Sequence, residues 1–98
     1  MAIVEVTIVP LGTESTSLSK YVAACHKVLK DSGLKHQLTP MSSIIEGDMN
    51  EILETIKKMH EVPFNEGAMR VSTQIKIDDR RDKKGSMDQK LESVNSKL

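Results

Sequence analysis

The residues best suited to chemistry stand near the start of the chain, where a polar strand face leads into a run of hydroxyl groups. In the segment 3–9, Glu5 and Thr7 share one face while the other face is entirely apolar, which is the period of a half-buried strand. A proline and a glycine break this strand before the hydroxyl-rich run 13–19, where a helix is predicted to begin. The combination places a carboxylate and a hydroxyl on a sheet surface beside a helix start, and we expect the function on that surface.

The hydroxyl run has two interpretations. Ser15 and Thr16 can cradle an anion such as a phosphate, because free amides and the helix dipole favour negative charge at a helix start. Alternatively, Ser17 is an ordinary helix cap and the two preceding residues belong to a loop. The sequence alone favours capping.

Further polar side chains occur in two extended runs near the middle of the chain. Three of them carry hydroxyl groups that can orient a ligand: Thr39, Ser42 and Ser43. Glu46 adds a carboxylate, which suits a cationic ring or an amino group, but it is equally compatible with a plain strand end. Glu5 has a structural alternative too, since it can pair with Lys76 on a neighbouring strand.

The sequence shows no arrangement typical of nucleophilic catalysis or of a metal centre. Cys25 and His26 are adjacent in a predicted helix, so their side chains diverge by about 100 degrees, and we expect Cys25 in the core. The three histidines and the Asp78-Asp79 pair lack the spacing of metal ligands, so we predict no metal and no cofactor. The mixed charge run 78–84 is typical of a solvated segment or of salt bridges between subunits, and for Arg80 and Arg81 we favour such a bridge over a phosphate grip.

The hydrophobic pattern predicts the element order βαββαβ. Strand-like alternation occupies 3–9, 34–39, 42–46 and 71–78, and helical spacing occupies 18–29 and 49–59. We expect Ser17 to cap the first helix and Gly33 to end it. Asp48 with Glu51 has the form of a capping box for the second helix, and Pro63 should end or bend that helix.

This order predicts a single α+β domain over residues 1–98, a ferredoxin-like plait with an antiparallel four-stranded sheet. Both helices lie on one face, and the first strand lies centrally between the third and fourth. The apolar strand positions expected to meet the helices are Val4, Val6, Ile8, Leu38, Ile45, Ile75 and Ile77. The positions expected on the uncovered face are Ile3, Glu5, Thr7, Val9, Gln37, Thr39, Ser42, Ile44, Glu46, Gln74 and Lys76.

A short helical pattern begins at Ser86, and its apolar stripe consists of Met87, Leu91, Val94 and Leu98. This stripe is narrow, and the sequence leaves two alternatives for it: packing on the edge of its own sheet or on a neighbouring subunit.

Composition restricts the functional classes. Formal net charge is zero, so no overall field attracts nucleic acid or an anionic membrane. A single cysteine, no signal-peptide pattern and no long apolar run predict a cytoplasmic protein that is not membrane-bound. A domain of 98 residues has a thin stability margin, which makes self-association an expectation.

Three segments together resemble the small thiamine-binding protein family of the YkoF-like superfamily. They are the strand exit 9–13 with Ser15-Thr16-Ser17 and Tyr21-Val22, the Ile45-Glu46-Gly47 turn, and the run 75–82. The resemblance implies a ferredoxin-like subunit whose uncovered faces pair into homodimers and then homotetramers. It also implies binding of thiamine (vitamin B1) or its hydroxymethylpyrimidine part without chemistry, and it favours Glu46 as a ligand contact. The predicted ligand-binding residues are Thr7, Ser15, Thr16, Thr39, Ser42, Ser43 and Glu46.

Two alternative functions remain from the sequence. A small-metabolite enzyme is possible if apposed subunits assemble Glu5, Glu46 and Lys76 into one site. An RNA-binding module shares the topology, but the aromatic residues Tyr21 and Phe64 both fall outside the predicted strands, where base stacking needs them. A non-catalytic binder of a small ligand is the favoured prediction.

Overall fold

The computed structural model describes residues 1–12, 18–82 and 86–98. In these parts of the chain the elements are β1 (Ala2–Leu11), α1 (Ser19–Asp31), β2 (Lys35–Leu38), β3 (Ser43–Gly47), α2 (Met49–Asn65), β4 (Arg70–Asp79) and α3 (Met87–Asn95). The predicted order βαββαβ, followed by a short C-terminal helix, is confirmed. None of the described helices combines the length and the apolar character that spanning a membrane requires.

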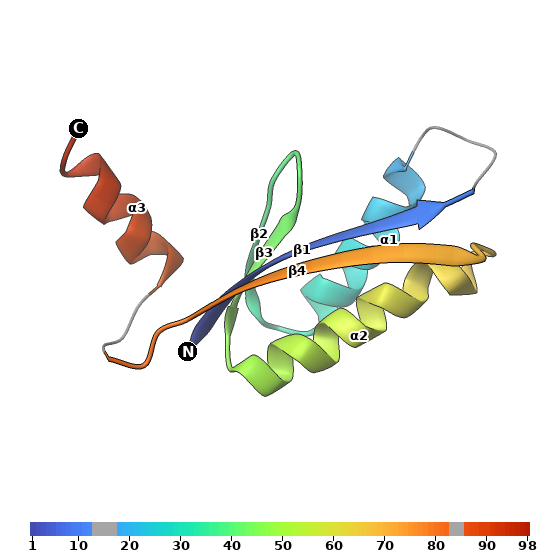
Figure 1. Ribbon diagram of the computed structural model, residues 1–98, viewed down its shortest axis with the longest axis horizontal. Helices are drawn as coiled ribbons and strands as arrows, with labels where there is room; N and C mark the ends of the chain where they lie inside the picture. The colour runs from blue at the N-terminus through green and yellow to red at the C-terminus, as the bar shows by residue number, and fades with distance from the viewer. Residues whose placement is uncertain (13–17, 83–85) are drawn as a thin grey trace.

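The strands form one antiparallel sheet in the order β2-β3-β1-β4, so the first strand is central as predicted. The register sets Val4 beside Ile45 and, one residue further, Glu5 beside Ile44. Helices α1 and α2 pack on the face that carries Val4 (Figure 1). The opposite side, which we call the open face, carries Ile3, Glu5, Thr7, Val9, Gln37, Ile44, Glu46, Gln74 and Lys76. This is the ferredoxin-like plait.

The core lies between the sheet and the two helices. Its buried residues are Ala2, Val4, Val6, Cys25, Leu29, Ile45, Ile52, Ile56 and Met59. Three residues predicted to be in the core are not buried. Leu38, Ile75 and Ile77 lie on the helix side of the sheet, but their exposed fractions are 49%, 44% and 44%. Both β2 and β4 are edge strands, so their apolar side chains are covered from one side only.

Helix α1 begins one residue later than the pattern indicates. Its N-cap is Leu18, which makes no side-chain capping bond, and the predicted cap Ser17 lies outside the described residues. The end of the helix agrees with the prediction. Gly33 follows the C-cap Ser32 with a φ of 75°, a conformation that suits a residue without a Cβ atom.

Helix α2 has the predicted cap but continues through its proline. The Asp48 carboxylate accepts a hydrogen bond from the Glu51 amide at 3.1 Å.

Pro63 is buried within the last turn of α2, where its missing N–H leaves the carbonyl of Met59 without the usual helical donor. The thiol of Cys25 in α1 lies 3.5 Å from that carbonyl oxygen and donates to it. A bond between helices therefore replaces the bond that the proline removes.

Helix α3 stands apart from α1 and α2 (Figure 1). The Ser86 hydroxyl caps it, accepting from the Gln89 amide at 3.1 Å. Of its predicted apolar stripe, Met87 is buried, whereas the other three residues, Leu91, Val94 and Leu98, are exposed. The stripe thus lacks cover within one chain.

Ion pairs attach α3 to the body of the molecule. Lys35 of β2 bonds Asp88 at 2.5 Å, and Lys90 bonds Asp78 of β4 at 2.6 Å. The Cα radius of gyration is 14.7 Å. A compact domain of this length has a radius of roughly 12.6 Å, so the protruding helix enlarges the molecule.

Candidate functional site

A pocket opens where β1 continues past the end of its neighbour β3. The two strands pair only as far as Val6 and Ser43, whereas β1 runs on to Leu11 with β4 alone beside it. The β2–β3 hairpin points away from this part of β1 (Figure 1). Between them lies a cavity of about 410 Å³, bounded by β1, the hairpin bend and the first turns of α1. We call it the hairpin pocket, and its volume falls within the range of small-molecule sites.

Four of the seven predicted ligand-binding residues line the hairpin pocket: Thr7, Thr39, Ser42 and Ser43. Thr7 belongs to the open face and Ser43 to the helix side, so the pocket passes through the plane of the sheet. Of the other three predicted residues, Ser15 and Thr16 lie outside the described residues, and Glu46 is considered below.

Thr39 holds the hairpin bend in shape. Its hydroxyl oxygen accepts from the amides of Met41 and Ser42, at 3.3 and 3.0 Å, and donates to the Ser42 carbonyl at 2.9 Å. A threonine that bonds to the backbone two and three residues on stabilises a tight turn. The first contribution of Thr39 is therefore to position the pocket wall.

A polar chain leads from this bend to a carboxylate on β1. The hydroxyls of Thr39 and Ser42 are 3.2 Å apart, and Ser42 Oγ donates to Glu5 Oε2 at 2.9 Å. Glu5 stands on the open face, two residues before the pocket residue Thr7. Sequence reasoning expected a bond from Glu5 to Lys76. The register makes those two residues neighbours, but the recorded bond goes to Ser42.

The remaining wall of the pocket is apolar. Leu18 and Val22 of α1 contribute one side, and Met41 lies at the mouth, 83% exposed. Cys25 and Met59 form the inner end. Burial raises the pKa of the Cys25 thiol, so it stays protonated and serves as a hydrogen-bond donor rather than a nucleophile.

Glu46 lies away from the hairpin pocket. It faces Ile3 in the register, four residues before Thr7, which is about 13 Å along the strand. Its side chain is only 4% exposed, and Lys35 Nζ lies 3.3 Å from Oε2. The approach lacks hydrogen-bond geometry, so Oε2 is buried without a donor. The negative charges of Asp88, first, and of Glu46, second, raise the pKa of Lys35.

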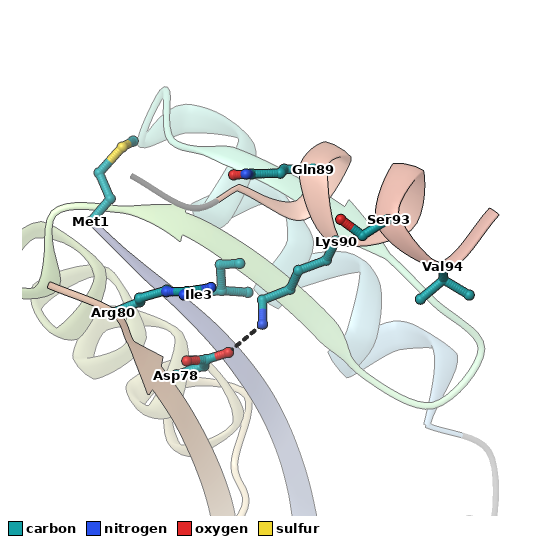
Figure 2. Close-up of a pocket in the computed structure, with 8 residues that line it drawn as sticks. All are labelled: Met1, Ile3, Asp78, Arg80, Gln89, Lys90, Ser93 and Val94. Atoms are coloured by element: carbon teal, nitrogen blue, oxygen red, sulfur yellow. Dashed lines mark hydrogen bonds and ion pairs between the residues drawn. The ribbon is translucent and has the colours of Figure 1, made fainter. Parts of the chain in front are cut away.

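A second hollow of about 390 Å³ lies between α3 and the start of β1 (Figure 2). Its charged side chains are already paired: Lys90 points at Asp78, and Arg80 bonds Asp82 at 2.6 Å. Lys90 holds the pKa of Asp78 below its usual range. Arg81 likewise bonds Asp79. Both arginines therefore form ion pairs within the chain, and the salt bridges between subunits stay a prediction.

Within the described ranges, no cluster of three histidine, cysteine or acidic side chains is placed to hold a metal ion. The three residues proposed for an enzymatic site, Glu5, Glu46 and Lys76, share the open face. In one chain, however, Glu5 bonds Ser42 and Glu46 lies against Lys35.

The fold and the site define a class: a small α+β protein with a ferredoxin-like plait and a hydroxyl-lined pocket at the end of its sheet. The sequence profile described as thiamine-binding protein matches residues 4–95, so the chain belongs to the thiamine-binding protein family.

Relatives from bacteria and archaea cover the whole chain. The UPF0045 protein YqgV of Bacillus subtilis is 49% identical, over 100% of this chain and 98% of its own length. A UPF0045 protein of Methanothermobacter thermautotrophicus is 42% identical over the full length of both.

Solved structures agree with the fold. The crystal structure of hypothetical protein MJ1052 from Methanocaldococcus jannaschii gives a TM-score of 0.89 at 37% identity, covering 96% of this chain and 95% of that one. A candidate thiamine biosynthesis/salvage protein of Thermotoga maritima gives a TM-score of 0.78 at 20% identity, covering 95% and 97%. The second likeness concerns the fold alone.

Proposed function

We propose that this protein binds thiamine or its hydroxymethylpyrimidine part, without chemistry, in the hairpin pocket. The observation that carries the proposal is the convergence of the Thr7, Ser42 and Ser43 hydroxyls on one cavity of about 410 Å³, with the Glu5 carboxylate bonded to Ser42. Membership of the thiamine-binding family supports the same ligand class.

The pocket matches the chemistry of such a ligand. An aminopyrimidine carries ring nitrogens that accept hydrogen bonds and an amino group that donates them, and hydroxyl side chains can do both. Glu5 offers a carboxylate to the amino group or to the positive thiazolium ring, and such charge-assisted bonds are the stronger ones. Met41 and Val22 offer apolar surface to the ring faces.

A second subunit completes the site in this proposal. The pocket is reached from the open face, which mixes Ile3, Val9 and Ile44 with polar side chains and has no helix over its centre. Pairing of two open faces in a homodimer, and of dimers in a homotetramer, would cover the ligand and exclude water.

Ser15, Thr16 and Glu46 remain predicted ligand contacts. In the sequence, the first two stand three and two residues before Leu18, which lines the pocket. For Glu46, the buried oxygen without a donor supports a role for an incoming amino group. The proposed compartment is the cytoplasm, which is supported by the free, buried thiol of Cys25.

Thermal unfolding with and without thiamine tests the proposal. A ligand at about 100 times its dissociation constant stabilises the folded state by about 2.7 kcal/mol, which for a domain of this size raises the melting temperature by about 10 °C or more. The matched control ligand is a thiamine analogue with oxygen in place of the pyrimidine amino group, and we expect a smaller rise. No rise with millimolar thiamine or hydroxymethylpyrimidine would contradict the proposal. Mass spectrometry of the recovered ligand should find it unchanged, whereas a product would indicate an enzyme.

A further inference from the structure

Strand β4 forms one edge of the sheet and has features that favour pairing with another strand. It is 10 residues long, contains no proline, and pairs with β1 without a bulge from Arg70 to Asp79. The opposite edge strand, β2, has only 4 residues. Proteins usually shorten, bend or cover an edge strand, because its unpaired amides and carbonyls bind other strands. Among the described residues, β4 has no such protection along its outer edge.

Apolar side chains flank this edge on the helix side. Ile75 and Ile77 of β4 are partly exposed, and so is Phe64 of α2. His60 of α2 bonds the Thr73 hydroxyl at 2.7 Å, and its ring contacts Phe64. That side of α2 is therefore next to β4, as Figure 1 also shows. A partner added at the edge would bury an apolar strip as well as main-chain groups.

We infer that β4 pairs antiparallel with β4 of a second copy, about a two-fold axis through Gln74. The two four-stranded sheets then form one sheet of eight strands. Pairing of residues 70–78 with their symmetry mates would add about eight to ten main-chain hydrogen bonds. It would also bring the two α2 helices side by side over the new seam.

Symmetry restricts the possible registers. Residues directly opposite each other in an antiparallel pair lie on the same face, and neighbours along a strand lie on opposite faces. The axis must therefore pass through a residue rather than between two residues. The registers that keep most of the strand paired are centred on Thr73, Gln74 or Ile75.

Charge selects one of these three. With the axis at Gln74, Arg70 of each copy faces Asp78 of the other, so two opposite-charge pairs form. With the axis at Thr73, Arg70 faces Lys76, and with the axis at Ile75 it faces Arg80. The Thr73 register places like charges opposite each other within the strand. The Ile75 register does so only at its end, because Arg80 directly follows β4, and it forms no opposite-charge pair.

The Gln74 register also suits the remaining pairs. On the helix side, Val71 faces Ile77 and Thr73 faces Ile75, which are β-branched pairs that pack well across strands. Asp78 already holds Lys90 through Oδ2, and a carboxylate accepts more than one donor. The edge pairing leaves the open face free, so it is independent of the proposed ligand site.

Site-specific disulfides test both the pairing and its register. Thr73 and Ile75 lie on the helix side, where pairing of open faces cannot bring two copies together. We would prepare Thr73→Cys and Ile75→Cys in the full chain, with distinguishable masses, and oxidise each alone and in an equimolar mixture. A disulfide needs Cβ atoms about 3.5–4.5 Å apart, which only directly opposite residues approach. Wild-type chain, with its buried Cys25, is the matched control.

The expected result is a disulfide between the two variants in the mixture and none in either variant alone. Cross-linking of Thr73→Cys alone or of Ile75→Cys alone would establish another register and overturn the inference, as would no cross-link at all. Native mass spectrometry of wild-type chain is the second measurement. A monomer at micromolar concentration contradicts the edge pairing. Because pairing of open faces would also give even numbers of chains, the cross-link pattern is the readout that identifies the interface. That readout involves neither thiamine nor the open face, so its failure is distinct from failure of the proposed function.

Discussion

Glu5 is the side chain that joins the open face to the hairpin pocket. Its carboxylate accepts the Ser42 hydroxyl, and Ser42 is in turn next to the Thr39 hydroxyl that holds the bend. Glu46 is the more buried carboxylate, but it lies about 13 Å from Thr7 against Lys35. The structure therefore makes Glu5 the nearer partner for a cation in the pocket.

We expect Glu5→Gln to weaken thiamine binding by about tenfold or more. The substitution keeps shape but replaces a charge-assisted hydrogen bond, which contributes about 1.5–3 kcal/mol, with a neutral one. Isothermal titration measures the dissociation constants. Glu46→Gln, at the competing carboxylate on the same open face, is the comparison variant, and we expect it to weaken binding less. If Glu46→Gln weakens binding more than Glu5→Gln does, the sequence-based assignment of Glu46 is the better one.

The contact between α1 and α2 depends on a pair of residues that compensate each other. Pro63 removes a helical amide donor, and the Cys25 thiol donates to the Met59 carbonyl that is left over. Because buried carbonyls are almost always satisfied, this thiol has a structural role at the inner end of the pocket.

A double-mutant cycle tests this compensation. Cys25→Ala should lower the free energy of unfolding by about 1–3 kcal/mol, because a buried carbonyl loses its donor and a side chain is truncated. In a Pro63→Ala background the helix regains its own N–H, so the same substitution should cost about 0.5–1 kcal/mol less. Urea denaturation measures all four proteins, and Cys25→Ser, which keeps a donor, is the control. Additive effects would show that the thiol bond contributes nothing.

The whole molecule consists of a packed body and a helix attached to it mainly by charges. Asp78 and Lys90 form one attachment of α3, and Lys35 with Asp88 forms the other. Both pairs are largely exposed, and the apolar residues Leu91 and Val94 have no cover in one chain. An arrangement of this kind should respond to salt and pH more than the core does.

The attachment of α3 should be strongest between about pH 4 and pH 10. Lys90 lowers the pKa of Asp78, so that contribution is complete above the ordinary aspartate value of 3.8 and is lost as pH falls through the lowered pKa. Asp88 raises the pKa of Lys35, so that contribution is complete below 10.5 and is lost as pH rises through the raised pKa. Amide hydrogen exchange in α3, corrected for intrinsic rates, should therefore speed up below pH 4. At neutral pH it should also speed up in about 1 M salt, because the Debye length there is only about 3 Å. Exchange in α2 is the internal control. Unchanged protection of α3 in salt would indicate that Met87 alone holds the helix.

Much of the fold was predictable because the local patterns agree with the final packing. The alternation in β1 and β4, the Asp48 and Ser86 caps, and Gly33 as a helix end all correspond to the structure. The errors fall where cover by another element decides the outcome. Leu38, Ile75 and Ile77 have the pattern of core residues but lie on edge strands.

The candidate site was predictable only in part. Residue types marked Thr7, Thr39, Ser42 and Ser43, and they line one pocket. The bond of Glu5 to Ser42 was not predicted, because the sequence pointed to Lys76, its neighbour on the adjacent strand, as the structural partner. The separation of Glu46 from the others depends on the pairing register, and a sequence without its strand partners does not show a register.

By itself, the sequence determined the zero net charge, the order of strands and helices and the two faces of the sheet. The last two follow from periodicity and capping, which act over a few neighbouring residues. Only the tertiary structure decided that β1 extends beyond its pairing with β3, which leaves the hairpin pocket open. It also decided that β4 forms a long edge of the sheet. The physical reason is that both features arise from differences in length and register between strands distant in the chain, which only their packing fixes.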